Sequence, residues 1–259
     1  MNTDTRARLG ETVLTGISKS FAGHRVLDGV SLTIRTGETL ALVGESGSGK
    51  STFGRILVGL EKPDRGEITV DGHTVKPGPR AGVSMIFQDP YDSIDPRFTV
   101  RRIVGEPVRG RATDQQIQEI LADVGLPGLS LDMRAVRMSG GQRQRLCIAR
   151  ALISEPRIVV CDEATAALDA VIKTQVLDLL LRVQHDRALG MMFITHDLDI
   201  ATRFADRIAV LENGRIVEEG TSDAVSQDPQ HPYTQKLFGS VLAGHPGHRH
   251  GHEYSTDDG

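Results

Sequence analysis

A short glycine-rich run carries the residue types needed to bind phosphate. Residues 44–51 read Gly-Glu-Ser-Gly-Ser-Gly-Lys-Ser and match the pattern G-x-x-x-x-G-K-[S/T] at every fixed position. Its glycines let the backbone curl so that successive N–H groups point at phosphate oxygens, and a following helix adds its positive N-terminal dipole. Lys50 would reach the β- and γ-phosphates, and the Ser51 hydroxyl would ligate Mg²⁺. The run therefore predicts a nucleoside triphosphate site.

Two adjacent carboxylates end an apolar run later in the chain. Residues 158–163 read Ile-Val-Val-Cys-Asp-Glu. A carboxylate at the end of a strand opposite a phosphate loop can hold Mg²⁺ through water, and Asp162 suits that task. Glu163 beside it can orient and deprotonate an attacking water, which makes it the candidate general base. Such a pair can also be a charge pair at a helix N-terminus, but the phosphate loop favours the catalytic interpretation.

Two further polar residues follow apolar runs in the same way. Gln88 comes after 83–87, and His196 comes after 191–195. Open α/β sheets bind ligands at the carboxyl ends of their strands, so both side chains are expected at the edge that carries the phosphate loop. His196 is predicted to sense the γ-phosphate and the attacking water, although a structural histidine is the alternative. Gln88 is predicted to contact Mg²⁺ or the water.

A second turn has the character of an anion site but lacks the lysine. Residues 138–142 read Met-Ser-Gly-Gly-Gln and precede a helical pattern. Ser139 and the amides of Gly140 and Gly141 would present donors at a helix N-terminus. On local sequence alone, an ordinary serine-capped helix explains the run equally well.

The elements that must position these residues follow from the spacing of apolar side chains. Continuous apolar runs predict buried strands, alternation predicts half-buried strands, and D-G and N-G pairs predict hairpins. The predicted strands are 12–17, 30–34, 40–43, 83–87, 157–161 and 191–195, with hairpins joining 67–70 to 73–75 and 208–211 to 216–217. The predicted helices are 51–60, 100–108, 113–124, 140–153 and 171–185. The pattern indicates a mostly parallel α/β core interrupted by a helical insertion.

Taken together, these residues resemble the signature of ATP-binding-cassette (ABC) ATPases over about residues 10–240. The resemblance implies a RecA-like P-loop core with an antiparallel β lobe and an inserted helical subdomain. The divisions expected are 1–87 for the β lobe and first part of the core, 88–156 for the helical subdomain, 157–227 for the second part of the core, and 228–259 for the C-terminal segment and tail.

The resemblance also implies a role for each matching residue. The residues expected to contact ATP are Phe21 under the adenine, the loop residues Gly44, Glu45, Ser46, Gly47, Ser48, Gly49, Lys50, Ser51 and Thr52, the signature residues Ser139, Gly140, Gly141 and Gln142, and Asp169 of the D-loop. Those expected to hold Mg²⁺ are Ser51, Gln88 and Asp162, and those expected to be catalytic are Glu163, His196, Gln88 and Lys50. The cofactors implied are ATP and Mg²⁺.

Three positions depart from the family pattern. Met138 replaces the usual Leu before the signature turn, Ala164 replaces Pro, and Ala166 replaces Ser. In this family two chains sandwich two ATP molecules head to tail, and the signature turn of one faces the phosphate loop of the other. Loss of the hydroxyl at position 166 puts one contact across that dimer in doubt, but not hydrolysis.

Two segments narrow the resemblance. Residues 88–97 (Gln-Asp-Pro-Tyr-Asp-Ser-Ile-Asp-Pro-Arg) and 231–234 (His-Pro-Tyr-Thr) resemble the ATPases that serve di-/oligopeptide and nickel importers. This likeness implies a second ABC ATPase subunit, either a paralogue or a second copy, two transmembrane permease subunits and, indirectly, a solute-binding protein. The segment 88–102 would receive the permease at the cytoplasmic face of the membrane. The alternative is an accessory ATPase of a soluble enzyme complex of the carbon–phosphorus lyase type.

Composition excludes several other classes. The chain carries 30 basic and 34 acidic residues, a net charge of −4, and only 4% aromatic residues without tryptophan, which argues against a nucleic-acid coat. Apolar runs stop near five residues, so no bilayer-spanning helix is expected, and the polar residues 1–10 predict no secretory signal. Four histidines of the last fifteen residues, His245, His248, His250 and His252, suit Ni²⁺ or Zn²⁺, although a solvated tail is the alternative.

Overall fold

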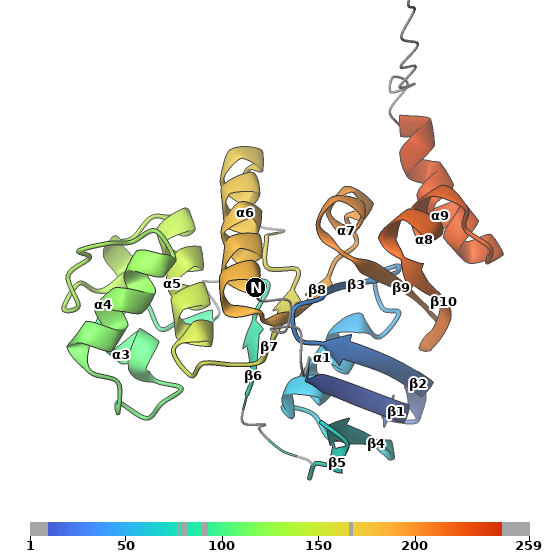
Figure 1. The fold of residues 1–259 in the computed structure, drawn as a ribbon, viewed down its shortest axis with the longest axis horizontal. Helices are drawn as coiled ribbons and strands as arrows, with labels where there is room; N and C mark the ends of the chain where they lie inside the picture. Colours follow the sequence, from blue (N-terminus) through green and yellow to red (C-terminus); the bar gives the residue numbers. More distant parts are fainter. Residues whose placement is uncertain (1–9, 77, 79–81, 90–92, 166–167, 245–259) are drawn as a thin grey trace, which may run out of the picture.

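The computed structural model describes residues 10–76, 78, 82–89, 93–165 and 168–244, which form two sheets and the helices that surround them (Figure 1). The strands are β1 (Glu11–Phe21), β2 (His24–Arg35), β3 (Thr39–Val43), β4 (Arg65–Val70), β5 (His73–Thr74), β6 (Val83–Ile86), β7 (Ile158–Asp162), β8 (Gly190–Ile194), β9 (Arg207–Glu212) and β10 (Arg215–Thr221). The helices are α1 (Lys50–Val58), α3 (Val100–Gly105), α4 (Asp114–Asp123), the 3₁₀ turn η1 (Ala135–Arg137), α5 (Gly140–Leu152), α6 (Ala170–Arg187), α7 (Leu198–Phe204), α8 (Ser222–Gln227) and α9 (Pro232–Gly244).

The core sheet has six strands in the order β10-β9-β3-β8-β7-β6. Strands β9, β3, β8, β7 and β6 run parallel, and β10 closes one edge as an antiparallel hairpin with β9. All residues of β3, β7 and β8 are buried, as continuous apolar strands covered on both faces should be. The register pairs Asp162 with Ile194 and Leu42 with Ile194, so β3, β7 and β8 end side by side.

The second sheet is antiparallel, in the order β2-β1-β4-β5. Its first two strands have 11 and 12 residues, longer than predicted, because register shifts between Leu14 and Ser20 interrupt the alternation of buried and exposed side chains. The predicted hairpin at Asp71-Gly72 is confirmed, since Val70 pairs with His73.

Helix α1 lies between the two sheets. One core cluster unites Phe53, Ile56 and Leu57 of α1 with side chains of both sheets, such as Leu14 and Leu42. On the other face of the core sheet, α6 packs its buried leucines against alternate residues of β7 and β8. Each side of the sheet is therefore covered, and burial of apolar surface keeps the ends of its strands in place.

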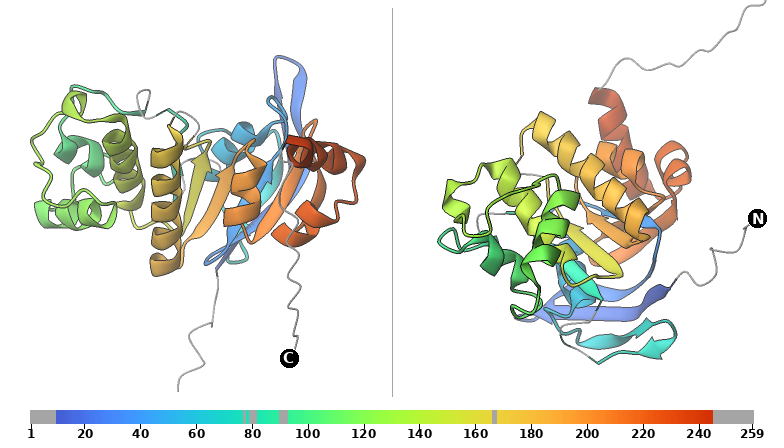
Figure 2. Two further views of the ribbon diagram at one scale, coloured as in Figure 1. Left: turned by 90° about the horizontal axis from the view of Figure 1, so that it is seen from above. Right: turned by 60° about the vertical axis from the view of Figure 1, so that its left-hand side comes forward.

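The predicted helical insertion is confirmed. Helices α3, α4 and α5 lie between β6 and β7 in sequence, although these strands are direct parallel neighbours in the sheet. The helices gather at one end of the molecule (Figure 2). Helix α3 ends at Gly105, three residues earlier than predicted, because Pro107 has no backbone N–H to continue the helical hydrogen bonds. None of the helices in the described ranges combines the length and hydrophobicity needed to cross a bilayer.

Sequence patterns missed α7, α8 and α9. The first two have only seven and six residues, fewer than two turns, so apolar periodicity cannot reveal them. Their starts are marked instead by capping side chains, Asp197 accepting from Ile200 N–H and Thr221 accepting from Ala224 N–H.

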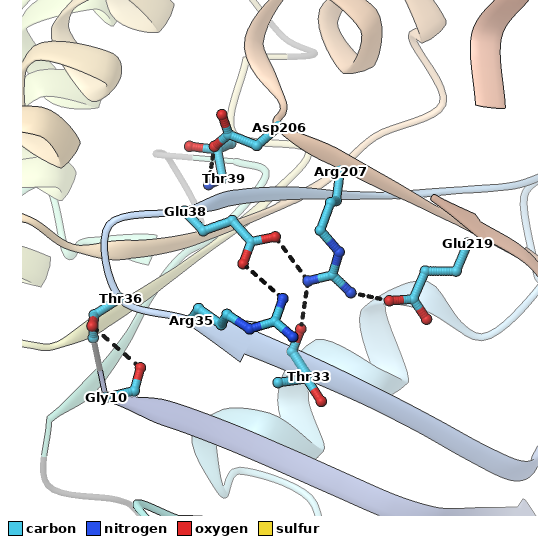
Figure 3. Close-up of polar contacts among 9 residues, drawn as sticks. All are labelled: Gly10, Thr33, Arg35, Thr36, Glu38, Thr39, Asp206, Arg207 and Glu219. Atoms are coloured by element: carbon cyan, nitrogen blue, oxygen red, sulfur yellow. Dashed lines mark hydrogen bonds and ion pairs between the residues drawn. The ribbon is translucent and has the colours of Figure 1, made fainter. Parts of the chain in front are cut away.

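The Arg207 side chain joins the two sheets (Figure 3). The guanidinium of Arg207, at the start of β9, donates to the Thr33 carbonyl of β2 at 3.3 Å and to Glu38 Oε1 at 2.8 Å. It also pairs with Glu219 of β10. Arg207 and Glu38 are mostly buried, whereas Arg35, which donates to the same Glu38 from β2, is 44% exposed.

We predict that Arg207→Met lowers the free energy of unfolding by about 2–3 kcal/mol, because it leaves the mostly buried Glu38 without its main partner. Urea denaturation measures the change. The matched control is Arg35→Met, which removes the exposed partner of the same carboxylate and is expected to cost less than about 1 kcal/mol. Equal losses in the two variants would contradict the assignment of Arg207 as the main partner of Glu38.

Candidate active site

The phosphate loop follows β3 and is pressed against its neighbours. Gly44 has φ +150, and a Cβ there would lie 2.2 Å from the Leu211 carbonyl oxygen of β9. Gly49 has φ +108, and a Cβ would lie 2.7 Å from the Val26 carbonyl oxygen of β2. These two positions therefore require glycine both for backbone conformation and for space.

Lys50 lies in the loop with only 6% of its surface exposed. Its Nζ donates to the carbonyl oxygens of Gly44 and Glu45, each at 2.8 Å. Burial lowers the pKa of Lys50, while the nearby carboxylates of Glu163 and Asp162 oppose that shift. The ammonium group is thus desolvated and held by neutral carbonyls, which favours an incoming phosphate as a stronger partner.

Two of the three residues predicted to hold Mg²⁺ are in contact. The Ser51 hydroxyl donates to Asp162 Oδ1 at 2.8 Å, across 111 residues of sequence. Asp162, at the end of β7, is 6% exposed, and burial raises its pKa against the lowering effect of the Ser51 hydrogen bond. No group of three or more His, Cys, Asp or Glu in the described ranges could hold a metal by itself. One carboxylate and one hydroxyl fit Mg²⁺, which takes its remaining oxygens from phosphates and water.

Glu163 contacts two of the three other residues predicted to be catalytic. Gln88 Nε2 donates to Glu163 Oε2 at 3.1 Å, and His196 Nδ1 lies 3.0 Å from Glu163 Oε1. The Glu163 backbone has φ +47, and its N–H donates to the Ile194 carbonyl at 2.9 Å. A carboxylate with hydrogen-bonding neighbours on both sides can hold a water and accept its proton.

A cavity of about 450 Å³ opens over these groups. Its lining includes Gly47, Lys50, Ser51, Gln88 and Glu163. A second cavity of about 490 Å³ shares Ser51 and Gln88 and extends to Asp162. The buried hydroxyl of Ser48 has no hydrogen-bond partner within the described part of the chain, which leaves a further loop donor uncommitted.

The residues predicted from the signature turn lie elsewhere. Ser139 caps α5, its hydroxyl accepting from Gln142 N–H at 3.2 Å, while Gln142 Oε1 accepts from Ser139 N–H at 2.9 Å. They and Gly140 and Gly141 do not line the cavity at the phosphate loop. The turn is therefore free of its own chain's loop, as a surface that serves another chain would be.

Phe21 and Asp169 also lie outside that cavity lining. The Phe21 ring, at the end of β1, is 45% exposed, with Lys19 Nζ 5.0 Å from its centre. Asp169 caps α6 by accepting from the N–H groups of Val171 and Ile172. Ala166, residues 90–92 of the importer-like segment and the four tail histidines lie outside the described residues.

The sequence patterns missed two residues that contact site segments. Gln144 of α5 is fully buried and donates through Nε2 to the Ala164 carbonyl at 2.6 Å, next to Glu163. Tyr233 of α9 accepts a hydrogen bond from the loop amide of Glu45. The sequence signal for Gln144 was its position as a polar residue on the apolar side of α5. Tyr233 had no signal beyond its place in the segment 231–234.

A profile of the ABC transporter family matches residues 27–166. The chain belongs to the ABC transporter family. It is 42% identical over 228 residues to the oligopeptide transport ATP-binding protein OppF of Lactococcus lactis subsp. lactis (strain IL1403), which covers 83% of this chain and 72% of that protein. It is also 42% identical over 258 residues to the glutathione import ATP-binding protein GsiA of Escherichia coli (strain K12), covering 95% of this chain but only 41% of that longer protein.

Solved ABC cassettes have the same fold. An ATP-binding cassette of an ABC transporter, MJ1267, in its ADP conformation is 25% identical with a TM-score of 0.76, covering 89% of this chain and 99% of that one. The cassette MJ0796, in a dimeric post-hydrolysis state bound to ADP and Pi, is 28% identical with a TM-score of 0.71, covering 82% and 98%. The predicted α/β cassette fold and the predicted family are confirmed, and the chain is an ATPase that uses ATP.

The buried Asp162 carboxylate of this ABC cassette is expected to lower the stability of the nucleotide-free chain while serving nucleotide binding. Because burial raises the pKa of Asp162, its ionised form opposes folding, and this penalty grows as the pH rises above the ordinary value of 3.8. We predict that Asp162→Asn stabilises the nucleotide-free chain at neutral pH by about 1 kcal/mol and abolishes the Mg²⁺-dependent stabilisation by ATP.

Thermal unfolding at several pH values, with and without MgATP, measures both effects. The control is Asp169→Asn, which keeps an equally good cap on an exposed helix end and is expected to leave the nucleotide-free melting temperature unchanged. A lower melting temperature for Asp162→Asn at neutral pH would contradict the penalty.

Proposed function

We propose that the chain is the ATP-hydrolysing subunit of an ABC importer for peptides. The observation that carries hydrolysis is the contact of Glu163 with both Gln88 and His196 beside the phosphate loop. The proposal of import rests on the relatives described above, whose names refer to oligopeptide transport and glutathione import. Because glutathione is itself a short peptide, both names support peptides as the class of solute.

Each residue has a distinct task in the proposed reaction. The loop amides and Lys50 bind the phosphates of ATP, and Lys50 balances charge on the transferred phosphoryl group. Ser51 and Asp162, with Gln88, would hold Mg²⁺, which supplies further positive charge at the phosphate oxygens. Glu163 orients the attacking water and takes its proton, while His196 holds the Glu163 carboxylate in place and faces the γ-phosphate.

The signature turn supports a dimeric active unit. Ser139 and the amides of Gly140 and Gly141 lie at the N-terminus of the 13-residue α5, a position that favours anions, and they do not line the cavity at the phosphate loop of the same chain. We propose that this turn, together with Asp169 and Phe21, completes ATP sites in a head-to-tail pair of cassettes. Binding then closes the pair and hydrolysis opens it. The second cassette is either a paralogue or another copy of this chain.

We propose that the permease contacts the segment 88–102 and the groove beside it. A groove of about 340 Å³ between the core and the helical group is lined by Leu60, Phe87, Pro107 and Arg150, among others. Leu60 is 56% exposed there. A permease helix in this groove would touch the residue next to Gln88, so movement of the two proteins and the state of the ATP site would be linked. This arrangement requires the chain to lie at the cytoplasmic face of the membrane.

The divisions 1–87, 88–156, 157–227 and 228–259 are retained as the proposed domain organisation. The names of the relatives favour import over the accessory-ATPase alternative. A nickel solute rests only on the resemblance of two short segments and on histidines outside the described residues, so peptides are the better-supported solute.

We predict that Glu163→Gln lowers kcat for ATP hydrolysis at least about 100-fold, because the general base is lost, while MgATP still binds. Phosphate release and calorimetry with the full chain measure the two effects. The control is Glu119→Gln on the exposed face of α4, which is expected to hydrolyse ATP at the normal rate. Normal hydrolysis by Glu163→Gln would refute its role as base.

The same variant tests the assembly. Tagged Glu163→Gln chain, isolated with ATP and Mg²⁺ from detergent-solubilised cells, should retain its natural partners because hydrolysis is blocked. Mass spectrometry is expected to find two multi-span permeases and an ABC ATPase subunit, with a solute-binding protein associated. A soluble enzyme complex without membrane proteins would overturn the importer and support the accessory ATPase.

A further inference from the structure

The segment His231–Thr234 is held in place by hydrogen bonds and by burial. Glu218 of β10 accepts from the N–H groups of Gln230 and His231, at 2.8 and 2.9 Å. The His231 ring nitrogen Nδ1 accepts from Tyr233 N–H at 3.2 Å, and Pro232 opens α9 at a position where a missing N–H costs nothing. Thr234 is completely buried. These contacts fix the start of α9, and with it the backbone of Tyr233.

The side chain of Tyr233 reaches the phosphate loop. Its Oη accepts from the Glu45 N–H at 2.9 Å, across 188 residues of sequence. That N–H belongs to the same planar peptide group as the Gly44 carbonyl, which accepts from Lys50 Nζ at 2.8 Å. One peptide group of the loop is therefore held at its amide end by the C-terminal helix and at its carbonyl end by the lysine.

The C-terminal elements support the loop at a second point. Gly214 N–H, in the turn between β9 and β10, donates to the Ser48 carbonyl at 3.1 Å. Helix α9 packs on these strands through a cluster that includes Val210, Val217, Tyr233 and Phe238 (Figure 1). Strands β9 and β10 and helix α9 thus form one packed unit that touches both halves of the phosphate loop.

We propose that Tyr233 is a positioning residue for the ATP site, and that α9 is the strap that carries it. The phenol keeps the Gly44–Glu45 peptide group from rotating. The Gly44 carbonyl therefore stays directed at Lys50, and the Lys50 ammonium group stays in the loop before ATP binds. Without the phenol oxygen, the peptide is free to turn, and MgATP binding has to order it again. The inference rests on nucleotide binding by the loop and does not depend on the permease or the solute.

A purely structural Tyr233 would behave differently. If the ring served only to pack α9 against β9 and β10, loss of its hydroxyl would lower thermal stability and leave the affinity for MgATP unchanged. If it positions the loop, affinity falls while turnover at saturating ATP is preserved, because the hydroxyl touches neither the water nor Glu163. The split between KM and kcat separates the two roles.

The test is Tyr233→Phe in the full chain. In steady-state hydrolysis, the KM for MgATP should rise about three- to tenfold, which corresponds to the free energy of one hydrogen bond. The kcat should stay within about twofold of that of the chain without the substitution. Calorimetry of MgATP binding in the Glu163→Gln background should show the same factor in Kd. The matched control is Ser226→Ala, which deletes a hydroxyl bound to the Ser222 carbonyl in neighbouring α8 and should leave both constants unchanged.

A second variant tests the strap itself. Glu218→Gln weakens the anchor of α9 without contacting the loop, and should raise KM in the same direction by a smaller factor. The double variant should bind MgATP no more weakly than Tyr233→Phe alone, because both act through one hydrogen bond.

Unchanged KM and Kd in Tyr233→Phe, or effects of the two variants that multiply independently, would overturn the inference while leaving the importer proposal standing. If the chain without any substitution binds no MgATP, that result would overturn both this inference and the importer proposal.

Discussion

The site depends on the close contact of two glycines of the phosphate loop with backbone carbonyl groups of neighbouring strands. Gly44 lies against the Leu211 carbonyl and Gly49 against the Val26 carbonyl, at separations that no side chain would permit. The curled loop is therefore held from outside by β9 and β2 as well as by its own bonds. Because those strands belong to different sheets, the geometry of the phosphate site requires the relative position of both sheets, which Arg207 and the α1 core maintain.

The parallel pairing of the core strands then brings the polar residues of the site together. Strands β3, β8 and β7 are neighbours with matched ends, so the residues that follow them meet although they come from distant parts of the sequence. Glu163 lies just past its strand with a left-handed backbone, which costs on the order of 1 kcal/mol for a residue with a side chain. Its N–H bond to Ile194 offsets part of that cost, and the carboxylate lies between Gln88 and His196.

The helical insertion is joined to this centre by a polar contact as well as by packing. Gln144 crosses from the helix of the signature turn to the carbonyl after Glu163, and it is completely buried. A buried hydrogen bond of this kind is costly to break, so α5 and the segment that carries Glu163 are expected to move together. The insertion thus carries the signature turn while remaining tied to the phosphate-loop site.

Local patterns determined much of this protein. The run 44–51, the carboxylates after an apolar strand and the hairpins at Asp71-Gly72 and Asn213-Gly214 are features of adjacent residues, so chain chemistry alone specifies them. Tertiary structure decided what distant segments share: the contacts of Glu163, the buried Ser51–Asp162 pair, the Gln144 bond and the reach of Tyr233 to Glu45. Sequence patterns report short-range periodicity, whereas these contacts exist only because the fold brings together residues that lie from 20 to 188 positions apart in the sequence.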